Sequence, residues 1–382
     1  MRIGLNLLHA QPDIGGGWNY IANLLAGLAE HAGDHEFVAF VTDASAVLVP
    51  AHPRFRQVHI PLRAASRARR ILYENVRLPG LARRMQLDVL HWFSNTHAPL
   101  SRTPSAVTVY DLLAFTPDAP WGMVKTGYLR AMIRSTVSSA DMLLPISIAT
   151  AADLRARLQA RPERMTVIPS VLPPRFQPVS AERVAAFRLT YALPERFWVY
   201  VAHFYPHKNH RLLVEACRQL ATIDRHAAWP LVLRGDGDRV REDIRRQAHD
   251  AGLDGRIVFL PRLEEAEMPA LYTGASALVF PSTYEGFGIP VIEAMACGCP
   301  VIASAQPAIV ESGQGAIWAV ADPSPAAFSE AMRALQADAG RRADLSRRGL
   351  ERARKFRSDA VVPRLMEAYA RAARQHGGAG TH

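Results

Sequence analysis

Short apolar runs alternate with longer amphipathic segments along almost the whole chain, and this alternation constrains the fold more than any other feature. Apolar runs bounded by loop residues are typical of buried strands, whereas the arginine-rich segments between them have helical patterns. We therefore expect a parallel β-sheet with helices on both faces. The expected strands are Ile3–Leu8, Phe37–Thr42, Asp88–Trp92, Ala106–Tyr110, Met142–Ile146, Met165–Pro169, Trp198–Ala202, Pro230–Arg234, Ile257–Leu260, Ala277–Phe280 and Val301–Ala303. The expected helices of the first half include Trp18–Glu30, Leu72–Met85 and Lys125–Ala140.

A proline-rich stretch interrupts this alternation near the middle of the chain. Four of the ten residues from Pro169 to Pro178 are proline, which cannot donate to a strand ladder and restricts the residue before it. The sequence therefore predicts two successive Rossmann-like α/β domains. We expect them at 1–172 and 195–357, with a linker at 173–194 and a helical C-terminal segment with a frayed tail at 358–382.

The chain is strongly basic. Its 45 Lys+Arg against 35 Asp+Glu give a net charge of +10, and only three of the cations are lysines: Lys125, Lys208 and Lys355. With 382 residues and 49% apolar residues the chain can bury ordinary cores, which excludes a disordered protein and a disulfide-stapled miniprotein. More than half of the charge excess lies within Leu62–Arg84, which holds Arg63, Arg67, Arg69, Arg70, Arg77, Arg83 and Arg84 against Glu74.

Apolar residues are interleaved with these arginines, so Leu62–Arg84 has the pattern of a basic amphipathic helix. Such a helix suits an anionic membrane surface, and a solvated surface helix explains the pattern equally well. A nucleic-acid partner is not expected, because aromatic interleaving, zinc-ligand spacing and helix-turn-helix signals are missing.

The compartment is predicted from cysteine content and hydropathy. Cys217, Cys297 and Cys299 cannot form a disulfide framework. No apolar run is long enough to span a bilayer, and the first residues lack the apolar core of a signal peptide. We expect a cytoplasmic protein, peripheral on the inner face of the cell membrane if the basic segment binds lipid.

Three consecutive glycines, Gly15, Gly16 and Gly17, follow the first expected strand and open the first expected helix. Unhindered backbone N–H groups at a helix start suit a phosphate or a sugar. A plain tight turn is an equal alternative. No Walker lysine follows the glycines, which argues against a P-loop NTPase.

A glycine loop with two glutamates follows the strand Ala277–Phe280. Glu285 lies in the loop, and Glu293 lies eight residues later in a helix that starts around Pro290. The free N–H groups of Gly288 and Ile289 would point at an anion. The loop suits a nucleotide-linked sugar, with the diphosphate at the helix start, the ribose on Glu293 and the sugar hydroxyls on Glu285. The alternative is that Glu285 caps the helix and Glu293 is a solvated helix residue.

The full string FPSTYEGFG (280–288), followed by EAMACGCPVIA (293–303), resembles the E-x7-E segment of glycosyltransferase family 4. YVAHFYPHKN (200–209) looks like the phosphate-binding segment of that family, and VYDL (109–112) and residues 140–147 resemble segments of its first domain. The overall resemblance is to a mannosyltransferase-like branch that builds bacterial O-antigen and exopolysaccharide. It implies the GT-B fold, with an acceptor-binding and a nucleotide-sugar-binding domain facing across a cleft and the C-terminal helix packing back on the first.

The resemblance also assigns roles to residues. It implies that Lys208 binds the donor diphosphate without a metal, and His203 stands where the family commonly has arginine or a neutral residue. The D-x-D-like pair Asp236 and Asp238 matches a glycine turn of the family, and no metal or cofactor is expected. The other implied donor-binding residues are Gly235, Arg262, Leu263, Glu285, Gly286, Phe287, Gly288, Ile289 and Glu293. In the first domain Tyr110 and Asp111 occupy a motif that usually reads His-Asp-Leu, so the contribution of position 110 is open.

The implied function is retaining transfer of a hexose from a nucleotide diphosphate donor to a saccharide acceptor. The branch favours mannose from GDP-mannose and a polyprenyl-diphosphate-linked acceptor. The alternatives are a UDP-sugar-dependent glucosyl- or N-acetylglucosaminyltransferase and a non-catalytic nucleotide-sugar-binding protein. A phosphorylase would need a lysine for pyridoxal phosphate, and few lysines are available.

Overall fold

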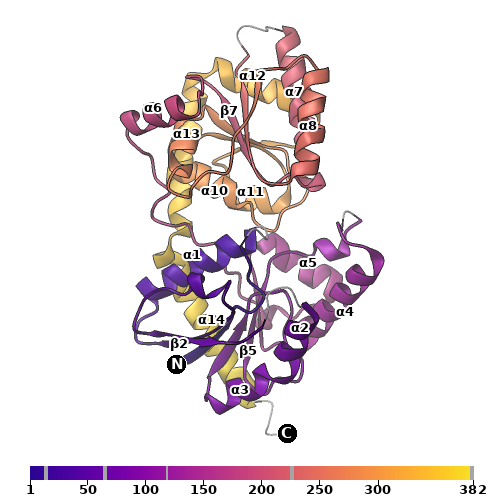
Figure 1. Cartoon of the computed structure of the whole chain (residues 1–382), viewed down its shortest axis with the longest axis vertical. Helices are drawn as coiled ribbons and strands as arrows, with labels where there is room; N and C mark the ends of the chain where they lie inside the picture. The colour runs from indigo at the N-terminus through magenta and orange to yellow at the C-terminus, as the bar shows by residue number, and fades with distance from the viewer. Residues whose placement is uncertain (13–15, 63–66, 118, 224–227, 379–382) are drawn as a thin grey trace. The chain divides into compact units, whose positions relative to one another are not determined.

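A computed structural model describes residues 1–12, 16–62, 67–117, 119–223 and 228–378. It divides into two compact units (Figure 1). Unit 1 comprises Met1–Val171 and Arg357–His382, and unit 2 comprises Leu172–Phe356.

Unit 1 is built on a parallel sheet whose strand order is β3-β2-β1-β4-β5-β6. Its strands are β1 (Arg2–Asn6), β2 (Glu36–Val41), β3 (Phe55–His59), β4 (Val89–Trp92), β5 (Ser105–Val109) and β6 (Met142–Pro145). Its helices are α1 (Gly16–His31), α2 (Arg67–Val76), α3 (Leu78–Arg84), α4 (Met123–Ser139), α5 (Ile148–Leu158) and α14 (Ser358–Gly378), with short 3-10 turns η1 (Ala46–Leu48), η2 (Leu113–Phe115) and η3 (Pro162–Arg164). The central strands β4, β5 and β6 are buried throughout, as in a sheet covered on both faces.

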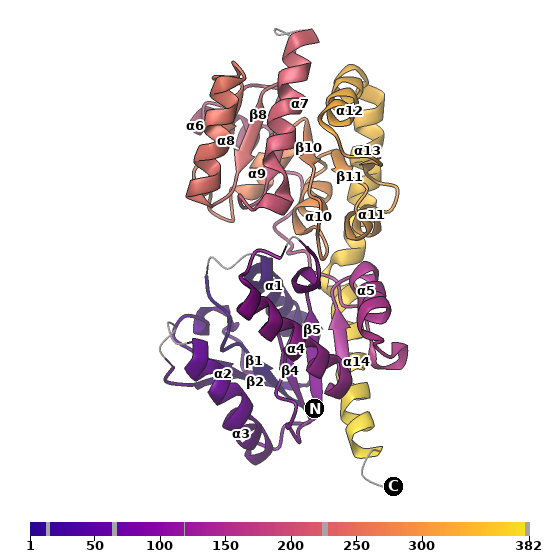
Figure 2. The same ribbon diagram turned by 90° about the vertical axis from the view of Figure 1, so that its right-hand side faces the viewer.

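Unit 2 repeats this design with the strand order β12-β11-β10-β7-β8-β9. Its strands are β7 (Trp198–Val201), β8 (Leu231–Arg234), β9 (Ile257–Phe259), β10 (Ala277–Phe280), β11 (Val301–Ser304) and β12 (Trp318–Val320). Its helices are α6 (Ala181–Thr190), α7 (His210–Ile223), α8 (Asp238–Asp250), α9 (Met268–Gly274), α10 (Ile289–Ala296), α11 (Pro307–Gly313), α12 (Pro325–Ala337) and α13 (Ala339–Ala353), with turns η4 (Pro206–Lys208) and η5 (Arg354–Phe356). Figure 2 shows α10 and α13 packed side by side in this unit.

The order of the strands positions the loops that carry the sequence motifs. In unit 2 the chain runs outward from β7 to β9 and then crosses to β10 on the other side of β7. Ligands of open parallel sheets bind beyond the carboxyl ends of the strands at such a reversal point. The loops after β7 and β10, which contain Lys208 and Glu285, therefore lie at the ligand-binding edge. The corresponding reversal in unit 1 lies between β1 and β4.

The C-terminal helix α14 completes unit 1, which confirms the expected packing of this helix on the amino-terminal domain. It lies against α1 and the sheet (yellow in Figure 1). The Tyr369 hydroxyl lies 2.6 Å from Nδ1 of His91 in β4, and Nε2 of the same ring lies 2.7 Å from Thr108 Oγ1 in β5. The described residues contain no helix that is both long and apolar enough to cross a bilayer.

Several expected elements differ in the structure. Met165–Pro169 forms no strand; it makes an isolated bridge between Met165 and Leu143, and the N–H groups of Thr166 and Ile168 donate to carbonyls of β6. The expected helix Leu72–Met85 is divided between α2 and α3, because Pro79 near the start of α3 has no N–H to continue the first helix. The 173–194 segment contains α6 and belongs to unit 2.

Candidate active site

The loop after β7 places Lys208 at the ligand-binding edge of unit 2. The turn η4 ends at Lys208, and Asn209 adopts a left-handed conformation with φ 53° before α7 begins. The hydroxyl of Tyr200 in β7 donates to the Lys208 carbonyl at 2.6 Å. The His207 carbonyl accepts from the backbone N–H of Thr283 at 2.8 Å, which ties this loop to the loop after β10. The backbone around Lys208 is therefore held by β7 and by the loop after β10.

The Lys208 ammonium and the Glu285 carboxylate form an ion pair. Nζ of Lys208 lies 2.5 Å from Oε1 of Glu285, and the two side chains are 17% and 10% exposed. The structure thus brings together two residues that are 77 positions apart in the sequence. A charged pair with so little solvent contact is weakly screened, so its members act strongly on any phosphate or sugar hydroxyl beside them.

The glycine loop leads directly into α10. Gly288 precedes the helix with φ 91°, a conformation that glycine adopts without strain, and Ile289 and Pro290 form the first turn. Phe287 is buried and makes an edge contact with Phe356 at 5.4 Å. The Gln306 side chain donates to the Glu285 carbonyl at 3.1 Å. These contacts fix the loop so that the first N–H groups of α10 are presented beside Glu285.

Glu293 on α10 is a buried carboxyl group rather than a solvated helix residue. It is 8% exposed, and its Oε2 accepts a hydrogen bond of 3.0 Å from the Tyr272 hydroxyl. Burial raises the pKa of Glu293 to about 7, against the opposing effect of the Tyr272 hydrogen bond. A carboxyl group poised near neutrality can accept hydroxyl hydrogens once it is ionised.

His203 lies beside the first residues after β8. Its Nδ1 accepts a hydrogen bond of 3.4 Å from the Asp236 backbone N–H and lies 3.7 Å from the Asp236 carboxylate. Burial, aided by the charges of Arg234 and Lys208, lowers the pKa of His203, and the Asp236 carboxylate opposes this. A ring nitrogen that accepts an N–H carries no proton, so His203 is neutral in this arrangement.

The remaining expected residues of unit 2 lie on the loops that follow β8 and β9. Gly235 and Gly237 connect β8 to α8. Arg262 and Leu263 follow β9; the former is exposed and the latter is 4% exposed. Among the described residues no group of three or more His, Cys, Asp or Glu side chains is arranged to hold a metal ion.

Tyr110 and Asp111 lie in unit 1, at the carboxyl end of β5. The Tyr110 hydroxyl is buried and has no hydrogen-bond partner among the described residues. The ring makes an edge contact with Tyr20 at 5.3 Å, and burial raises its pKa well above the usual value. Asp111 Oδ1 accepts from the Leu113 N–H at 2.9 Å and shapes the turn η2.

The glycine run divides between described and undescribed residues. Gly16 and Gly17 open α1, whereas Gly15 lies outside the described residues. A Cβ added at Gly17 would lie 3.8 Å from the Tyr110 hydroxyl oxygen. Gly17 and Tyr110 therefore share the ligand-binding edge of unit 1.

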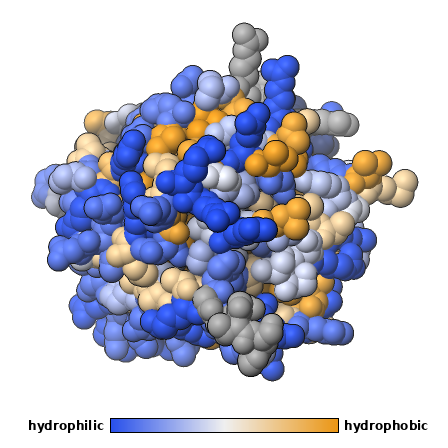
Figure 3. Space-filling view, turned by 90° about the horizontal axis from the view of Figure 1, so that it is seen from below, coloured by the Kyte–Doolittle hydropathy of each residue, from blue (hydrophilic) through white to orange (hydrophobic). Residues whose placement is uncertain are grey.

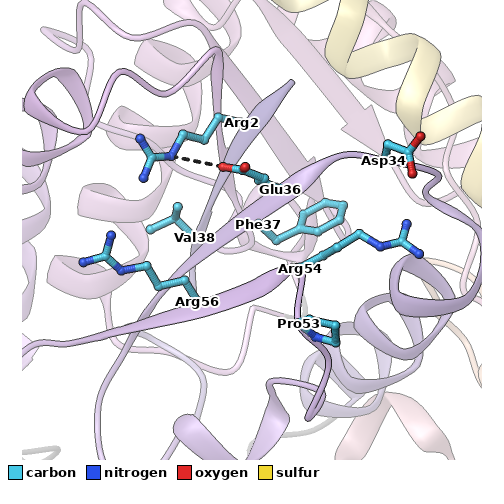
Figure 4. Close-up of a pocket in the computed structure, with 8 residues that line it drawn as sticks. All are labelled: Arg2, Asp34, Glu36, Phe37, Val38, Pro53, Arg54 and Arg56. Atoms are coloured by element: carbon cyan, nitrogen blue, oxygen red, sulfur yellow. Dashed lines mark ion pairs between the residues drawn. The ribbon is translucent and has the colours of Figure 1, made fainter.

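A surface hollow of about 390 Å³ lies elsewhere in unit 1 (Figure 4). Arg2 and Glu36, which line it and face one another at 3.7 Å, are the first residues of β1 and β2. The hollow is thus at the amino ends of the strands, opposite the edge where ligands of parallel sheets bind. We assign it no role in the site.

Sequence reasoning missed Tyr272 and Arg234. Tyr272 supplies the hydrogen bond to Glu293, and Arg234 acts electrostatically on both Glu293 and His203. Arg234 is the last residue of β8, and a cation ending an apolar strand was a signal that the abundance of arginine obscured.

Models of two protein families match the chain. The model described as Glycosyltransferase Family 4 matches residues 14–174, and the model described as Glycosyl transferases group 1 matches residues 186–352. A D-inositol 3-phosphate glycosyltransferase of Salinispora tropica is 33% identical over 63% of this chain and 53% of its own length. The chain thus spans about half the length of that relative. An O-antigen chain mannosyltransferase B of Escherichia coli is 27% identical over 74% of each chain.

Solved structures share the fold. A sucrose-phosphate synthase of Thermosynechococcus elongatus superposes with a TM-score of 0.77 over 100% of both chains at 22% identity. Anabaena HepE, in complex with UDP and glucose, superposes with a TM-score of 0.76 over 97% of this chain and 99% of its own at 16% identity.

Proposed function

The chain belongs to the family 4 glycosyltransferases of the GT-B fold, and from this premise we propose that it transfers a hexose, with retention of configuration, from a nucleotide diphosphate donor to a saccharide acceptor. The observation that carries the proposal is the Lys208–Glu285 pair at the strand reversal of unit 2. The Lys208 ammonium would bind a phosphate of the donor, and the Glu285 carboxylate would accept hydrogen bonds from the sugar hydroxyls. Both residues belong to loops near the start of α10.

The proposed mechanism is electrostatic. As the bond from the sugar to the diphosphate breaks, negative charge builds up on the departing phosphate, where Lys208 and the first N–H groups of α10 stabilise it. Preorganised stabilisation of this kind is usually the largest catalytic contribution. The departing phosphate accepts the proton of the attacking acceptor hydroxyl on the same face of the sugar. Glu285 and Glu293 orient the donor, and no metal is needed.

For the donor we favour GDP-mannose and for the acceptor a polyprenyl-diphosphate-linked saccharide of O-antigen or exopolysaccharide synthesis. Support comes from the E. coli O-antigen mannosyltransferase relative. A UDP-sugar donor is the second candidate, because the fold is shared with a protein crystallised with UDP and glucose. The E-x7-E contacts would be made with ribose and phosphates, which both donors carry.

Turnover tests the proposal directly. The full chain is incubated with GDP-mannose, UDP-glucose or UDP-N-acetylglucosamine and a lipid-linked saccharide acceptor, with and without EDTA. We expect release of the nucleoside diphosphate, an α-linked product by NMR and no effect of EDTA. Tight donor binding without turnover on any acceptor would instead support a non-catalytic binding protein, and an inverted product would contradict retention.

We further propose that unit 1 docks on an anionic membrane through α2 and the start of α4. Leu72 and Val76 on α2 are 65% and 63% exposed, and Met123 and Val124 on α4 are 93% and 90% exposed. Partial burial and the charge of the Arg67 guanidinium in α2 lower the pKa of Lys125 in the first turn of α4. Exposed apolar side chains among arginines suit shallow insertion between anionic headgroups.

Figure 3 shows one face of the molecule, on which small hydrophobic areas are interspersed among hydrophilic side chains.

Flotation with liposomes tests the membrane proposal. We expect the chain to float with vesicles that contain anionic phospholipid and to stay in solution with zwitterionic vesicles. The double substitution Leu72→Ser and Val76→Ser should weaken flotation and leave turnover on a soluble acceptor unchanged. Equal flotation with both vesicle types would contradict the proposal.

A further inference from the structure

Arg234 carries a positive charge for which the described part of the chain shows no hydrogen-bonding partner. It is the last residue of β8, its side chain is half-buried, and its buried Nε has no hydrogen-bond partner. Arg241 and Arg188 also have a buried Nε without a partner, but another nitrogen of each guanidinium forms a hydrogen bond. Arg241 donates to the Leu260 carbonyl and Arg188 to the Gly274 carbonyl. Leaving a guanidinium half-buried without a partner costs free energy unless a ligand supplies one.

The backbone places Arg234 next to the loop that holds Lys208. Val201 of β7 is the register partner of Arg234, and the Ala202 N–H donates to the Arg234 carbonyl at 2.9 Å. The Phe204 N–H then donates to the Asp236 carbonyl, also at 2.9 Å. The loops that follow β7 and β8 therefore run side by side, with His203 beside Asp236, two residues beyond the Val201–Arg234 pair.

Gly235 enforces this close approach. A Cβ at this position would lie 1.8 Å from the Ala202 carbonyl oxygen, a backbone atom that cannot move aside. The carboxyl end of β8 is thus held against the loop after β7. The charge of the Arg234 guanidinium lowers the pKa of His203 and, as a smaller effect, that of Glu293, so it is felt at both side chains.

The other charged groups near Arg234 do not neutralise the full negative charge of a bound diphosphate. The Lys208 ammonium is already paired with Glu285, and His203 is neutral because its Nδ1 accepts an N–H. A diphosphate in its ionised form carries more negative charge than one ammonium neutralises. Arg234 is the neighbouring cation that stays charged at every accessible pH and can bind two phosphate oxygens at once.

We propose that Arg234 is a donor-binding residue that contacts the diphosphate, as the second cation beside Lys208. The inference rests on the proposed nucleotide diphosphate donor and deepens it by assigning this role to a residue of β8 rather than to position 203.

The test compares Arg234→Gln with wild type in the full chain by titration calorimetry with GDP, UDP and ADP and with the corresponding monophosphates. We expect the affinity for the diphosphate that binds best to fall at least tenfold, and that for its monophosphate to change less than threefold. Arg246→Gln is the matched control, because Arg246 is an exposed arginine of α8 paired with Asp243, and it should bind like wild type.

A rescue experiment separates binding from a structural role. His203→Arg introduced into the Arg234→Gln chain should recover at least part of the diphosphate affinity, because it returns a long cationic side chain to the neighbouring loop, which runs alongside the end of β8. The melting temperature of the unliganded Arg234→Gln chain should equal or exceed that of wild type, since no hydrogen bond among the described residues is lost.

The outcomes discriminate between this inference and the function on which it rests. Diphosphate affinity within twofold of wild type in Arg234→Gln overturns the inference alone, as does an equal loss of monophosphate affinity or a lowered melting temperature without rescue. A wild-type chain that binds none of the three diphosphates overturns the proposed donor class and the inference with it.

Discussion

At the scale of single residues, Lys208 is the residue that the proposed mechanism depends on most. Its ammonium is 17% exposed and contacts Glu285 directly, so removing it takes away a weakly screened charge where a leaving phosphate would develop its own. We predict that Lys208→Ala lowers kcat/KM by roughly 10²–10³-fold, as for other groups that stabilise a developing anion. Initial rates of nucleoside diphosphate release measure this.

The chain offers a matched control for that substitution. Lys355 is exposed in η5, and its side chain forms no ion pair with a site residue in the described part of the chain, so Lys355→Ala should keep wild-type kinetics. Because Glu285 loses its partner in Lys208→Ala, melting temperatures of both variants must show that they are folded at the assay temperature. A loss of kcat/KM within twofold in folded Lys208→Ala would refute the assignment.

The raised pKa of Glu293 leads us to predict that both the free energy of unfolding and the donor affinity depend on pH. Because burial raises its pKa from 4.5 to about 7, the folded chain retains a proton that the unfolded chain releases between these values. The contribution of Glu293 to the free energy of unfolding therefore falls as the pH rises through this window. In the proposed donor complex the ribose hydroxyls would donate to the ionised Glu293 carboxylate, so we expect donor affinity to rise over the same pH range. With this pKa, the ionised fraction rises roughly tenfold from pH 6 to pH 8.

The measurement is nucleoside diphosphate affinity at pH 6 and pH 8 for wild type and Glu293→Gln. The glutamine keeps an acceptor for Tyr272 and does not titrate, so the increase should be confined to wild type. Titration of the phosphate itself is common to both proteins and cancels in the comparison. An equal pH dependence in both would show that Glu293 does not control donor binding.

How far the site could be predicted depends on whether its residues are adjacent in sequence. Glu285, Gly288 and Glu293 belong to one loop and helix, and their spacing was readable. The ion pair with Lys208 joins two loops, and only the strand order brings them together. Arg234 was hidden, because a single arginine among so many carries no signal until its register with β7 is known.

At the scale of elements, the paired loops after β7 and β8 depend on Gly235. Alanine at this position would place a Cβ 1.8 Å from the Ala202 carbonyl oxygen. We predict that Gly235→Ala lowers the free energy of unfolding by about 1–3 kcal/mol, as other overpacking substitutions do, and weakens diphosphate binding. Urea denaturation and calorimetry measure the two effects.

Gly127 in α4 provides the comparison for this substitution. No atom lies within 4 Å of a Cβ added there, and alanine is favoured over glycine in a helix by about 1 kcal/mol. Gly127→Ala should therefore be as stable as wild type or more so. If Gly235→Ala were equally stable, the two loops would not be as tightly constrained as the register indicates.

The strands that the sequence failed to predict have few buried residues. The edge strand β3 is largely exposed, and its residues FRQVH lack a continuous apolar run. The other unpredicted strand, β12, has three residues and is also at a sheet edge. Central strands must be apolar on both faces, whereas edge strands are specified by pairing with a neighbour that the sequence does not reveal.

At the scale of the whole molecule, the chain leaves unit 1 at Val171 and returns to it at Arg357, so unit 1 is complete only when α14 is in place. The helix contributes the buried residues Val361, Val362, Leu365, Ala368, Tyr369 and Ala372. A local sequence pattern predicts such a helix but does not specify which unit it joins. Here the buried polar contact between Tyr369 and His91 contributes to that specificity.

Tyr369→Phe tests this contact. Burial lowers the pKa of His91 to about 3, so the ring is neutral, and losing the Tyr369 hydroxyl leaves its Nδ1 buried without a partner. We predict a loss of about 1–3 kcal/mol in the stability of unit 1, the usual cost of such a group. Hydrogen exchange should show faster opening of β4 and α14, with diphosphate binding by unit 2 unchanged. Tyr128→Phe, at a 43% exposed tyrosine of α4, should leave exchange as in wild type. Unchanged exchange in Tyr369→Phe would mean that apolar packing alone holds α14 on unit 1.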